Sequence, residues 1–416
     1  MKDNQTSPHT KIAVIGLGYV GLPLAVAFAR HGNNVIGIDT GKNRLNELEI
    51  STQERERIDE KLHLSDNIKA AVGCDIFIIT VPTPVYADTR PNLSLLEAAT
   101  RDVGGVIKPG SLVIFESTVY PGVTEEICAP ILEKESALMF NHDFFCGYSP
   151  ERICTGLRGL NDIIKITSGS TAAAAKKVDD LYKKIITAGT CPVASIKIAE
   201  AAKLAENIQR DADISVTNQL AMIFGRMGIN SAAVFSAAAT KWNYRQFQPG
   251  LVGGHCIGTD SYYLLHKAQE EGINAALIAA VRQNNNAVPR FVADEALRLL
   301  KTRGRSPQDT KVLMLGFSFK ENSADVRHTL AGKLRCHLEE AGCQLSVCDP
   351  IADAPAALTE YALVLKTDVE TELAKKPHVI IFAVAHRQFT EIPSQLLGDA
   401  LVMDVKGVAP RADWRL

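Results

Sequence analysis

The sequence predicts an α/β protein with two doubly wound parallel sheets, and three observations support this prediction. A short apolar run, a glycine turn, a helical pattern and a second apolar run follow one another from Lys11, and the same order recurs from Lys311. The chain between the two repeats has a helical pattern throughout. Its 416 residues are too many for one domain. We therefore expect two Rossmann-like, doubly wound domains joined by a long central helix and a small all-helical domain.

The first domain begins with a strand over 11–15, a glycine turn over 16–21 and a helix over 22–31. A second strand is expected over 34–39. Further strands are predicted at 76–81 and 112–115, and helices at 93–107 and 123–135. Apolar strands that alternate with helices are typical of a parallel sheet buried on both faces.

The middle of the chain is expected to be helical, with an interruption at the glycine-rich stretch 249–258. Helices are predicted over 198–226, 231–239 and 260–303. A polar linker over 302–309 then leads into the second doubly wound domain. We place its strands at 311–316, 344–349, 378–383 and 400–404, and a helix at 329–341. The expected domains are residues 1–198, 199–304 and 305–416.

Composition excludes several classes of protein. A net charge of −2 argues against a binder of nucleic acid or of an anionic membrane. Nine cysteines without a CxxC pair fit reduced thiols better than a disulfide or zinc framework, so we expect no metal. No apolar stretch is long enough to span a membrane, and the first ten residues are polar. We expect a cytoplasmic protein.

The first glycine turn indicates a dinucleotide site. Gly16, Gly18 and Gly21 form GxGxxG between a strand and a helix, the place where backbone amides can approach a pyrophosphate. Asp39 ends the following strand, where its carboxylate could accept hydrogen bonds from ribose hydroxyls. This acid favours NAD over NADP, although Arg44 lies nearby. The alternative is a tight turn with a structural role only.

Cys256 is the candidate nucleophile. It lies in Gly253–Asp260, where flanking glycines would let the backbone approach a ligand. The alternative is a buried thiol, which is the commoner role of cysteine. Lys203, Asn207 and Arg210 follow i, i+4, i+7 spacing and would share one face of the long helix. A solvated helix face would show the same spacing.

Three further polar stretches stand out. Glu116–Gly122 and Ser149–Arg152 come at the carboxyl ends of expected strands, where open α/β sheets bind ligands. Phe319, Lys320 and Arg327 follow the second glycine turn and could hold a phosphate or carboxylate. Ordinary capped loops and surface charges remain alternatives for these stretches.

Taken together, these motifs resemble the UDP-glucose/GDP-mannose dehydrogenase family, the nucleotide-sugar 6-dehydrogenases, from Lys11 to about Gly407. The matching motifs, in the family's order, are Ile15–Pro23, Val81–Val85, Glu116–Gly122, Ser149–Arg152, Glu200–Asn207, Gly253–Cys256 and Phe319–Arg327. The Ser-Pro-Glu-Arg and Gly-Gly-His-Cys-Ile forms resemble the branch that acts on UDP-N-acetylhexosamines. The segments Thr240–Asn243 and Pro249–Gly254 most resemble the enzymes of Vi-type and O-antigen polysaccharide synthesis.

The resemblance implies a role for each matching residue. Cys256 would be the nucleophile, and Lys203 the acid/base or oxyanion stabiliser. Asn207 and Asp260 would hold intermediates and water, while Thr118 and Glu151 would orient the hydrolytic water. NAD would be contacted by Gly16, Gly18, Tyr19, Val20, Gly21, Asp39, Arg44, Thr83, Thr118 and Arg327. The nucleotide sugar would be contacted by Arg152, Ile153, Lys203, Asn207, Arg210, Gly253, Phe319, Lys320 and Lys406.

The implied reaction explains these residue types. Oxidation of the C6 alcohol to a carboxylate removes four electrons, so two NAD⁺ each take a hydride. A cysteine can trap the intermediate aldehyde as a thiohemiacetal, and the second hydride transfer leaves a thioester for water to hydrolyse. The resemblance also implies an NAD-binding domain, a central dimerisation domain with the cysteine loop and a UDP-sugar-binding domain. A homodimer or higher oligomer is expected.

The chain departs from the family pattern in three loops. Ile153–Gly156 replaces the usual Pro-Gly pair, and Gly258–Ser261 replaces a commoner hydrophobic-Asp-Pro sequence. Tyr244 and Arg245 stand where relatives place an arginine further from the cysteine. These changes touch the expected sugar pocket. The substrate predicted is UDP-N-acetylglucosamine or UDP-N-acetylgalactosamine. The alternatives are UDP-glucose 6-dehydrogenation and a catalytically silent protein that binds nucleotide sugars.

Overall fold

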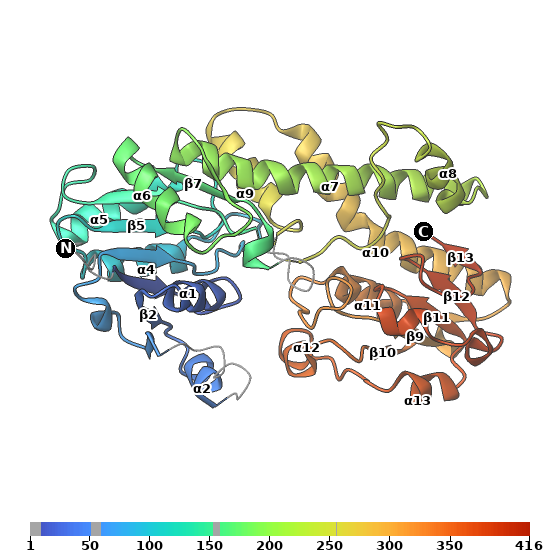
Figure 1. The fold of residues 1–416 in the computed structure, drawn as a ribbon. Coiled ribbons are helices and arrows are strands. Elements are labelled where there is room, and N and C mark those ends of the chain that lie inside the picture. Colours follow the sequence, from blue (N-terminus) through green and yellow to red (C-terminus); the bar gives the residue numbers. More distant parts are fainter. Residues whose placement is uncertain (1–9, 51–59, 153–158, 255) are drawn as a thin grey trace. The chain divides into compact units, whose positions relative to one another are not determined.

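The chain forms two compact units. The computed structural model describes residues 10–50, 60–152, 159–254 and 256–416. One unit comprises the chain up to Glu206 together with Tyr262–Glu270, and the other comprises Asn207–Ser261 and Glu271–Leu416 (Figure 1). Each unit contains one sheet whose strands are mainly parallel, so the predicted fold class is confirmed.

The sheet of the first unit has eight strands in the order β3-β2-β1-β4-β5-β6-β7-β8. Its first six strands follow the 3-2-1-4-5-6 order of a dinucleotide-binding sheet. All neighbours pair in parallel except β6 and β7, which are antiparallel. The strands are Lys11–Ile15, Asn34–Ile38, Leu62–Ser65, Ile76–Ile79, Leu112–Phe115, Phe145–Tyr148, Lys165–Gly169 and Thr190–Pro192. A strand ending before Ser149 was expected and is β6, whereas β3, β7 and β8, which are short or polar, were not predicted.

Helices pack on this sheet because its strands are apolar on both faces. All four residues of β5 are buried, and the core joins β1, β4 and β5 to α1 and α6. The α-helices are α1 (Gly21–Arg30), α2 (Lys42–Ile50), α4 (Ser94–Gly104), α5 (Ala129–Ser136) and α6 (Ala172–Lys183). A π-helical turn over Val123–Cys128 precedes α5, and short 3₁₀ turns lie at Ile68–Ala71 and Leu160–Asp162.

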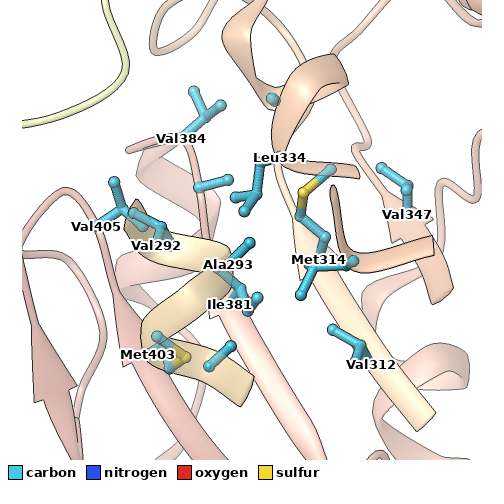
Figure 2. Close-up of a cluster of buried hydrophobic side chains, with 14 of the residues drawn as sticks. Val292, Ala293, Val312, Met314, Leu334, Val347, Ile381, Val384, Met403 and Val405 are labelled. Carbon is cyan, nitrogen blue, oxygen red and sulfur yellow. The ribbon is translucent and has the colours of Figure 1, made fainter. Parts of the chain in front are cut away.

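The sheet of the second unit has five parallel strands in the order β10-β9-β11-β12-β13. Figure 2 shows Val292 and Ala293 of α10 meeting Leu334 of α11 and apolar side chains of the sheet. The strands, in chain order from β9, are Lys311–Leu315, Gln344–Cys348, Val379–Phe382, Leu401–Asp404 and Trp414–Arg415. The helices are α11 (Leu330–Glu340), α12 (Ala354–Tyr361), α13 (Val369–Ala374) and α14 (Arg387–Thr390), with 3₁₀ turns at Pro307–Asp309 and Ser394–Leu397.

Four helices occupy the centre of the chain. They are α7 (Ile196–Arg226), α8 (Ser231–Ala238), α9 (Asp260–Glu270) and α10 (Ala276–Thr302). The helix predicted over 260–303 is therefore two helices. Gly272 has φ +68°, a left-handed conformation that ends α9. The prediction was wrong here because glycine within a helical pattern does not by itself reveal the conformation it adopts.

Candidate active site

The glycine turn of the first unit requires glycine at two of its three positions. Gly16 has φ +90°, which side chains rarely allow. A Cβ on Gly21 would fall on the carbonyl oxygen of Gly16 and the hydroxyl of Thr80. That hydroxyl donates to the Gly16 carbonyl at 2.7 Å. Thr80 thus holds the turn in place, a role that no local pattern around it revealed.

Gly18 differs from the other two glycines. A Cβ on Gly18 would meet no protein atom within 4 Å. Packing within the protein therefore does not demand glycine here, whereas a ligand approaching the backbone would. Tyr19 is exposed, and Val20 is the N-terminal cap of α1, whose first amides point out of the helix. The turn therefore fits the pyrophosphate of a dinucleotide.

Asp39 and Arg44 both contact this turn. One carboxylate oxygen of Asp39 accepts from the Leu17 amide at 2.8 Å, and the other accepts from the Gly41 amide at 2.8 Å. Arg44 donates to the Leu17 carbonyl at 3.1 Å. A carboxylate can accept about four hydrogen bonds, so half-buried Asp39 retains capacity for ribose hydroxyls. The residues present thus fit NAD.

Thr83 and Thr118, predicted to contact NAD, lie together. The Thr83 hydroxyl donates to the Thr118 carbonyl at 2.7 Å. Tyr263 of α9 donates to the Thr83 carbonyl at 2.6 Å, so a residue distant in sequence fixes the same loop. Tyr263 was not predicted because its partner lies far along the chain.

Lys203 and Glu151, two predicted catalytic residues, also lie near each other in the first unit. The Lys203 ammonium is 4.0 Å from a Glu151 carboxylate oxygen, and the residues are 4 % and 6 % exposed. Both charges are therefore shielded from water, where electrostatic interactions are stronger than at the surface. Arg152 pairs with Glu206 at 2.6 Å and donates to the Ile164 carbonyl, and its role in binding substrate stays a prediction. Ile153 lies outside the described residues.

A buried ion pair beneath Glu151 was not predicted. Lys165 lies 2.6 Å from Glu116 and donates to the Pro150 carbonyl at 3.0 Å. Tyr182 donates to the other oxygen of Glu116. Lys165 and Glu116 are both buried, so this pair connects the ends of β5 and β6 inside the protein. It fixes the backbone directly before Glu151.

Glu200 anchors the start of α7. Its two carboxylate oxygens accept from the backbone amides of Gly122 at 2.7 Å and Thr124 at 3.0 Å. Burial raises the pKa of Glu200, and these amides oppose the rise. The contacts bind the segment of helix that carries Lys203 to the loop that follows Thr118.

Three predicted catalytic residues come together in the second unit. The Asn207 amide donates to the Asp260 carboxylate at 2.6 Å. The Asp260 backbone amide donates to the Cys256 carbonyl at 2.8 Å. Cys256 is half-buried, so it is not a thiol enclosed in an apolar core. Lys203 and Asn207 are one turn apart on α7, as their spacing predicted.

The glycine loop before Cys256 packs directly on predicted substrate residues. A Cβ on Gly253 would lie 2.5 Å from the His328 carbonyl, and one on Gly250 would lie 2.5 Å from the Lys406 side chain. A Cβ on Gly254 would lie 2.6 Å from the Phe319 ring. Glycine is needed at these positions because the neighbouring segments approach so closely.

Lys406 carries a charge in a poorly hydrated place. Burial lowers the pKa of Lys406, the charge of Glu321 opposes this, and the charge of Arg210 lowers the pKa further. The positive charges of Arg210 and Lys406, two predicted substrate residues, therefore repel each other. An anion would relieve their repulsion. The Lys320 ammonium lies 5.6 Å from the Phe319 ring centre.

Arg327 is held by its own loop. Its guanidinium forms two hydrogen bonds with the Asp325 carboxylate, at 2.9 and 2.6 Å. Its predicted contact with NAD stays a prediction. Over the four described ranges, no group of three or more His, Cys, Asp and Glu side chains could hold a metal ion.

Comparison with known proteins identifies the family. The chain matches the UDP-glucose/GDP-mannose dehydrogenase family in three parts. Residues 10–186 match its NAD binding domain, 197–287 its central domain and 313–411 its UDP binding domain. The chain belongs to this family. It is an NAD-dependent dehydrogenase, and its first glycine turn lies in the NAD-binding domain of the family.

Individual relatives support this assignment. The chain is 45% identical to a UDP-N-acetyl-D-glucosamine 6-dehydrogenase of Pseudomonas aeruginosa, over 92% of both chains. It is 44% identical to a protein of the same name from Salmonella typhi, over 93% of this chain and 92% of that one. A UDP-N-acetylmannosamine dehydrogenase structure from Pyrococcus horikoshii matches with a TM-score of 0.87, at 28% identity and 98% coverage of each chain. No helix in the described part of this dehydrogenase is long and apolar enough to cross a membrane.

Proposed function

We propose that this dehydrogenase oxidises the C6 alcohol of a UDP-N-acetylhexosamine, with N-acetylglucosamine or N-acetylgalactosamine as the sugar, to the uronic acid. The observation that carries the proposal is the half-buried Cys256 on a turn whose Asp260 is hydrogen-bonded to Asn207. The relatives named UDP-N-acetyl-D-glucosamine 6-dehydrogenase support the choice of sugar. The whole reaction consumes one water and two NAD⁺ per sugar.

The chemistry assigns a step to each residue. NAD, when bound, supplies the hydride acceptor for both oxidations. The Cys256 sulfur adds to the aldehyde carbon formed in the first oxidation, and the resulting oxyanion takes up a proton. Loss of a hydride from the carbon and of the hydroxyl proton would then convert this thiohemiacetal into a thioester. Water then attacks the thioester carbon, the C–S bond breaks, and the thiol is regenerated.

Buried charges suit the groups that would move protons and stabilise oxyanions. The Lys203 ammonium would stabilise the tetrahedral oxyanions, an effect commonly worth about 3–4 kcal/mol per donor. The Glu151 carboxylate would accept a proton from the attacking water, which Thr118 would help to orient. Asn207 and Asp260 would hold the water and the intermediates. Tyr19, Val20, Arg44, Thr83 and Arg327 would complete the contacts with NAD.

The second unit supplies the cations for the nucleotide sugar. Arg210, Lys320 and Lys406 would bind the anionic diphosphate, because each is a cation close to the glycine loop or to the loop after Gly316. Gly253 and Phe319 would line the same site. Arg152 and Ile153 stay predicted contacts of the nucleotide sugar. The pKa of Lys406 is lowered chiefly by burial. An anionic ligand bound beside this lysine would stabilise its charged form.

We further propose a homodimer in the cytoplasm that serves surface polysaccharide synthesis. Val216 and Ile223 of α7 and Met227, the residue directly after it, follow helical spacing and are 57%, 48% and 65% exposed. An apolar stripe of this kind is typical of a surface that another chain covers. The proposed division of labour is NAD binding in 1–198, dimerisation and the cysteine loop in 199–304, and UDP-sugar binding in 305–416.

A panel of UDP-sugars tests the proposal through NADH formation. Acetylated UDP-hexosamines should release two NADH per sugar consumed and yield the uronic acid. Faster turnover of UDP-glucose would assign the alternative substrate. Normal NAD binding without NADH formation from any UDP-sugar would instead show a catalytically silent binding protein.

A further inference from the structure

A fully buried polar network in the second unit links α7, α10 and the start of α9. The Asp211 carboxylate accepts from the Arg282 guanidinium at 2.6 Å and from the Asn285 amide at 2.7 Å. Its other oxygen accepts from the Ser261 hydroxyl at 3.2 Å. All four side chains are 3% exposed or less. We refer to Asp211, Ser261, Arg282 and Asn285 as the loop clamp.

The loop clamp contacts both ends of the turn that carries Cys256. Arg282 donates to the carbonyl of Ile257, the residue directly after the cysteine, at 3.3 Å. Ser261 directly follows Asp260. The turn is closed by hydrogen bonds from the Thr259 and Asp260 amides to the Cys256 carbonyl, at 3.1 and 2.8 Å. The clamp therefore holds the short segment from Cys256 to Asp260 near its start, at Ile257, and directly after its end, at Ser261.

Burying the charges of Asp211 and Arg282 costs free energy, which the hydrogen bonds of the network offset in part. Burial raises the pKa of Asp211, and the Arg282 charge and three hydrogen-bonding side chains only partly oppose the rise. A buried ion pair adds little net stability compared with apolar packing, but it holds its members in defined positions. The clamp thus supplies orientation at the one turn where orientation matters for the sulfur.

We propose that the loop clamp positions Cys256 for its reaction. Ser261 is the member of the clamp that directly follows the turn, and it donates to Asp211 at 3.2 Å. The hydroxyl adds a direct contact between the turn and Asp211. This inference rests on the proposed nucleophilic role of Cys256, but the clamp's hold on the turn can be tested independently.

Hydrogen–deuterium exchange of the Thr259 and Asp260 amides measures the hold on the turn in the full-length protein. Ser261→Ala removes one hydroxyl and should speed exchange of these amides about tenfold, the lower end of the effect expected from losing one hydrogen bond to a carboxylate. Ser215→Ala is the matched control. Ser215 is a buried serine of α7 whose hydroxyl donates to the Val281 carbonyl of α10 at 3.3 Å. It should leave exchange at the turn unchanged.

Steady-state kinetics of the same variants test whether the hold matters for catalysis. Ser261→Ala should lower kcat about fivefold with little change in the KM for NAD, while Ser215→Ala should keep the kcat of the unmodified enzyme. Arg282→Lys retains the charge but lacks the guanidinium that donates to both Asp211 and Ile257, and it should show the same pattern provided that its thermal unfolding stays cooperative.

The outcomes separate the clamp from the proposed function. Wild-type exchange rates at Thr259 and Asp260 in both Ser261→Ala and Arg282→Lys would overturn the clamp. Faster exchange with unchanged kcat would overturn its positioning role. Full acid production by Cys256→Ala would refute the nucleophile, and the exchange data would still show whether the clamp holds the turn.

Discussion

The two units contain the same glycine turn but use it differently. In each, a glycine with positive φ follows the first strand of the repeat, Gly16 at +90° and Gly316 at +93°. The amide of each glycine donates to the last residue of the next strand in the repeat, Ile38 or Cys348, at 2.8 and 2.9 Å. The aspartate that follows that strand, Asp39 or Asp349, then accepts from the amide directly after the glycine, at 2.8 and 2.7 Å.

The aspartates differ in how much of their hydrogen-bonding capacity the protein uses. Half-buried Asp39 accepts from two backbone amides. Asp349 is fully buried. It accepts from the amides of Phe317, Ser318, Ile351 and Ala352 and from the His386 ring. Since the Asn322 amide donates to the other ring nitrogen, His386 is the donor to Asp349.

This difference separates a turn that can bind a ligand from one that supports a loop. In the first unit, α1 begins at Gly21, so the helix N-terminus lies directly behind the glycine. In the second, α11 begins at Leu330, and the intervening loop carries Phe319, Lys320 and Arg327. An acid after the second strand therefore does not by itself indicate a dinucleotide site. An acid that keeps unused hydrogen-bonding capacity, as Asp39 does, indicates one.

Replacing Asp349 should have the largest effect on the comparison. Asp349→Asn places an amide group against several N–H donors and should lower the unfolding free energy by about 3 kcal/mol or more. The matched variant Asp39→Asn should lose much less. Urea unfolding of both variants measures the contrast, and equal losses would contradict the assignment of a structural role to Asp349 alone.

Acid titration sharpens the same contrast. Burial alone would raise the pKa of Asp349, but hydrogen bonds from His386 and backbone amides outweigh it and lower the pKa below the ordinary 3.8. Such a carboxylate stabilises the fold above its unfolded pKa and loses this contribution as the pH falls through the folded pKa. The unmodified chain should therefore lose stability below about pH 4, and Asp349→Asn should show a flatter acid limb.

The first turn can be tested glycine by glycine. Gly21→Ala should destabilise the first unit by about 2 kcal/mol, because its methyl group would overlap the Gly16 carbonyl. Gly18→Ala has room within the protein and should leave the melting temperature unchanged while weakening NAD binding. Thermal melting and calorimetric titration with NAD distinguish the two. Unchanged NAD affinity in Gly18→Ala would contradict the inference that glycine is needed at position 18 for the approach of NAD.

The unused capacity of Asp39 predicts cofactor selectivity. Asp39→Asn should weaken NAD binding about tenfold, equivalent to about 1.4 kcal/mol. It should also narrow the preference for NAD over NADP, because the carboxylate that would repel the 2′-phosphate of NADP is gone. The ratio of kcat/KM for the two cofactors is the measurement. An unchanged ratio would mean that Asp39 serves the turn alone, as Asp349 does.

Replacing Lys406 should have the smallest effect, raising stability slightly while weakening substrate binding. Because burial lowers its pKa, the charged lysine costs stability, so Lys406→Met should raise the melting temperature slightly at neutral pH. The gain should shrink as the pH rises towards the ordinary lysine pKa of 10.5. The KM for the UDP-sugar should rise about fivefold with the loss of one charge-assisted contact. A lower melting temperature with an unchanged KM would contradict a role in binding.

Local patterns were sufficient for the parts of the fold and site whose signals lie within a few residues. The glycine turns, the apolar strands and the face shared by Lys203 and Asn207 were all predicted from spacing. Lys165 and Glu116 were not, because buried charges resemble surface charges in a sequence and these two are 49 residues apart. The antiparallel strand β7 and the tie from Tyr263 to Thr83 likewise depend on distant partners. The strand Lys165–Gly169 has only two β-branched residues, Ile166 and Thr167, which are too few to predict it.

The central claim is that Cys256 carries the sugar covalently between the two oxidations. Rapid quenching of the enzyme with NAD and a UDP-N-acetylhexosamine, followed by mass spectrometry of the peptide containing Cys256, measures this most directly. We predict a sugar adduct on that thiol. In Cys256→Ala, both the adduct and the production of uronic acid should be absent. An unmodified peptide, together with uronic acid formed by Cys256→Ala at the normal rate, would contradict the account.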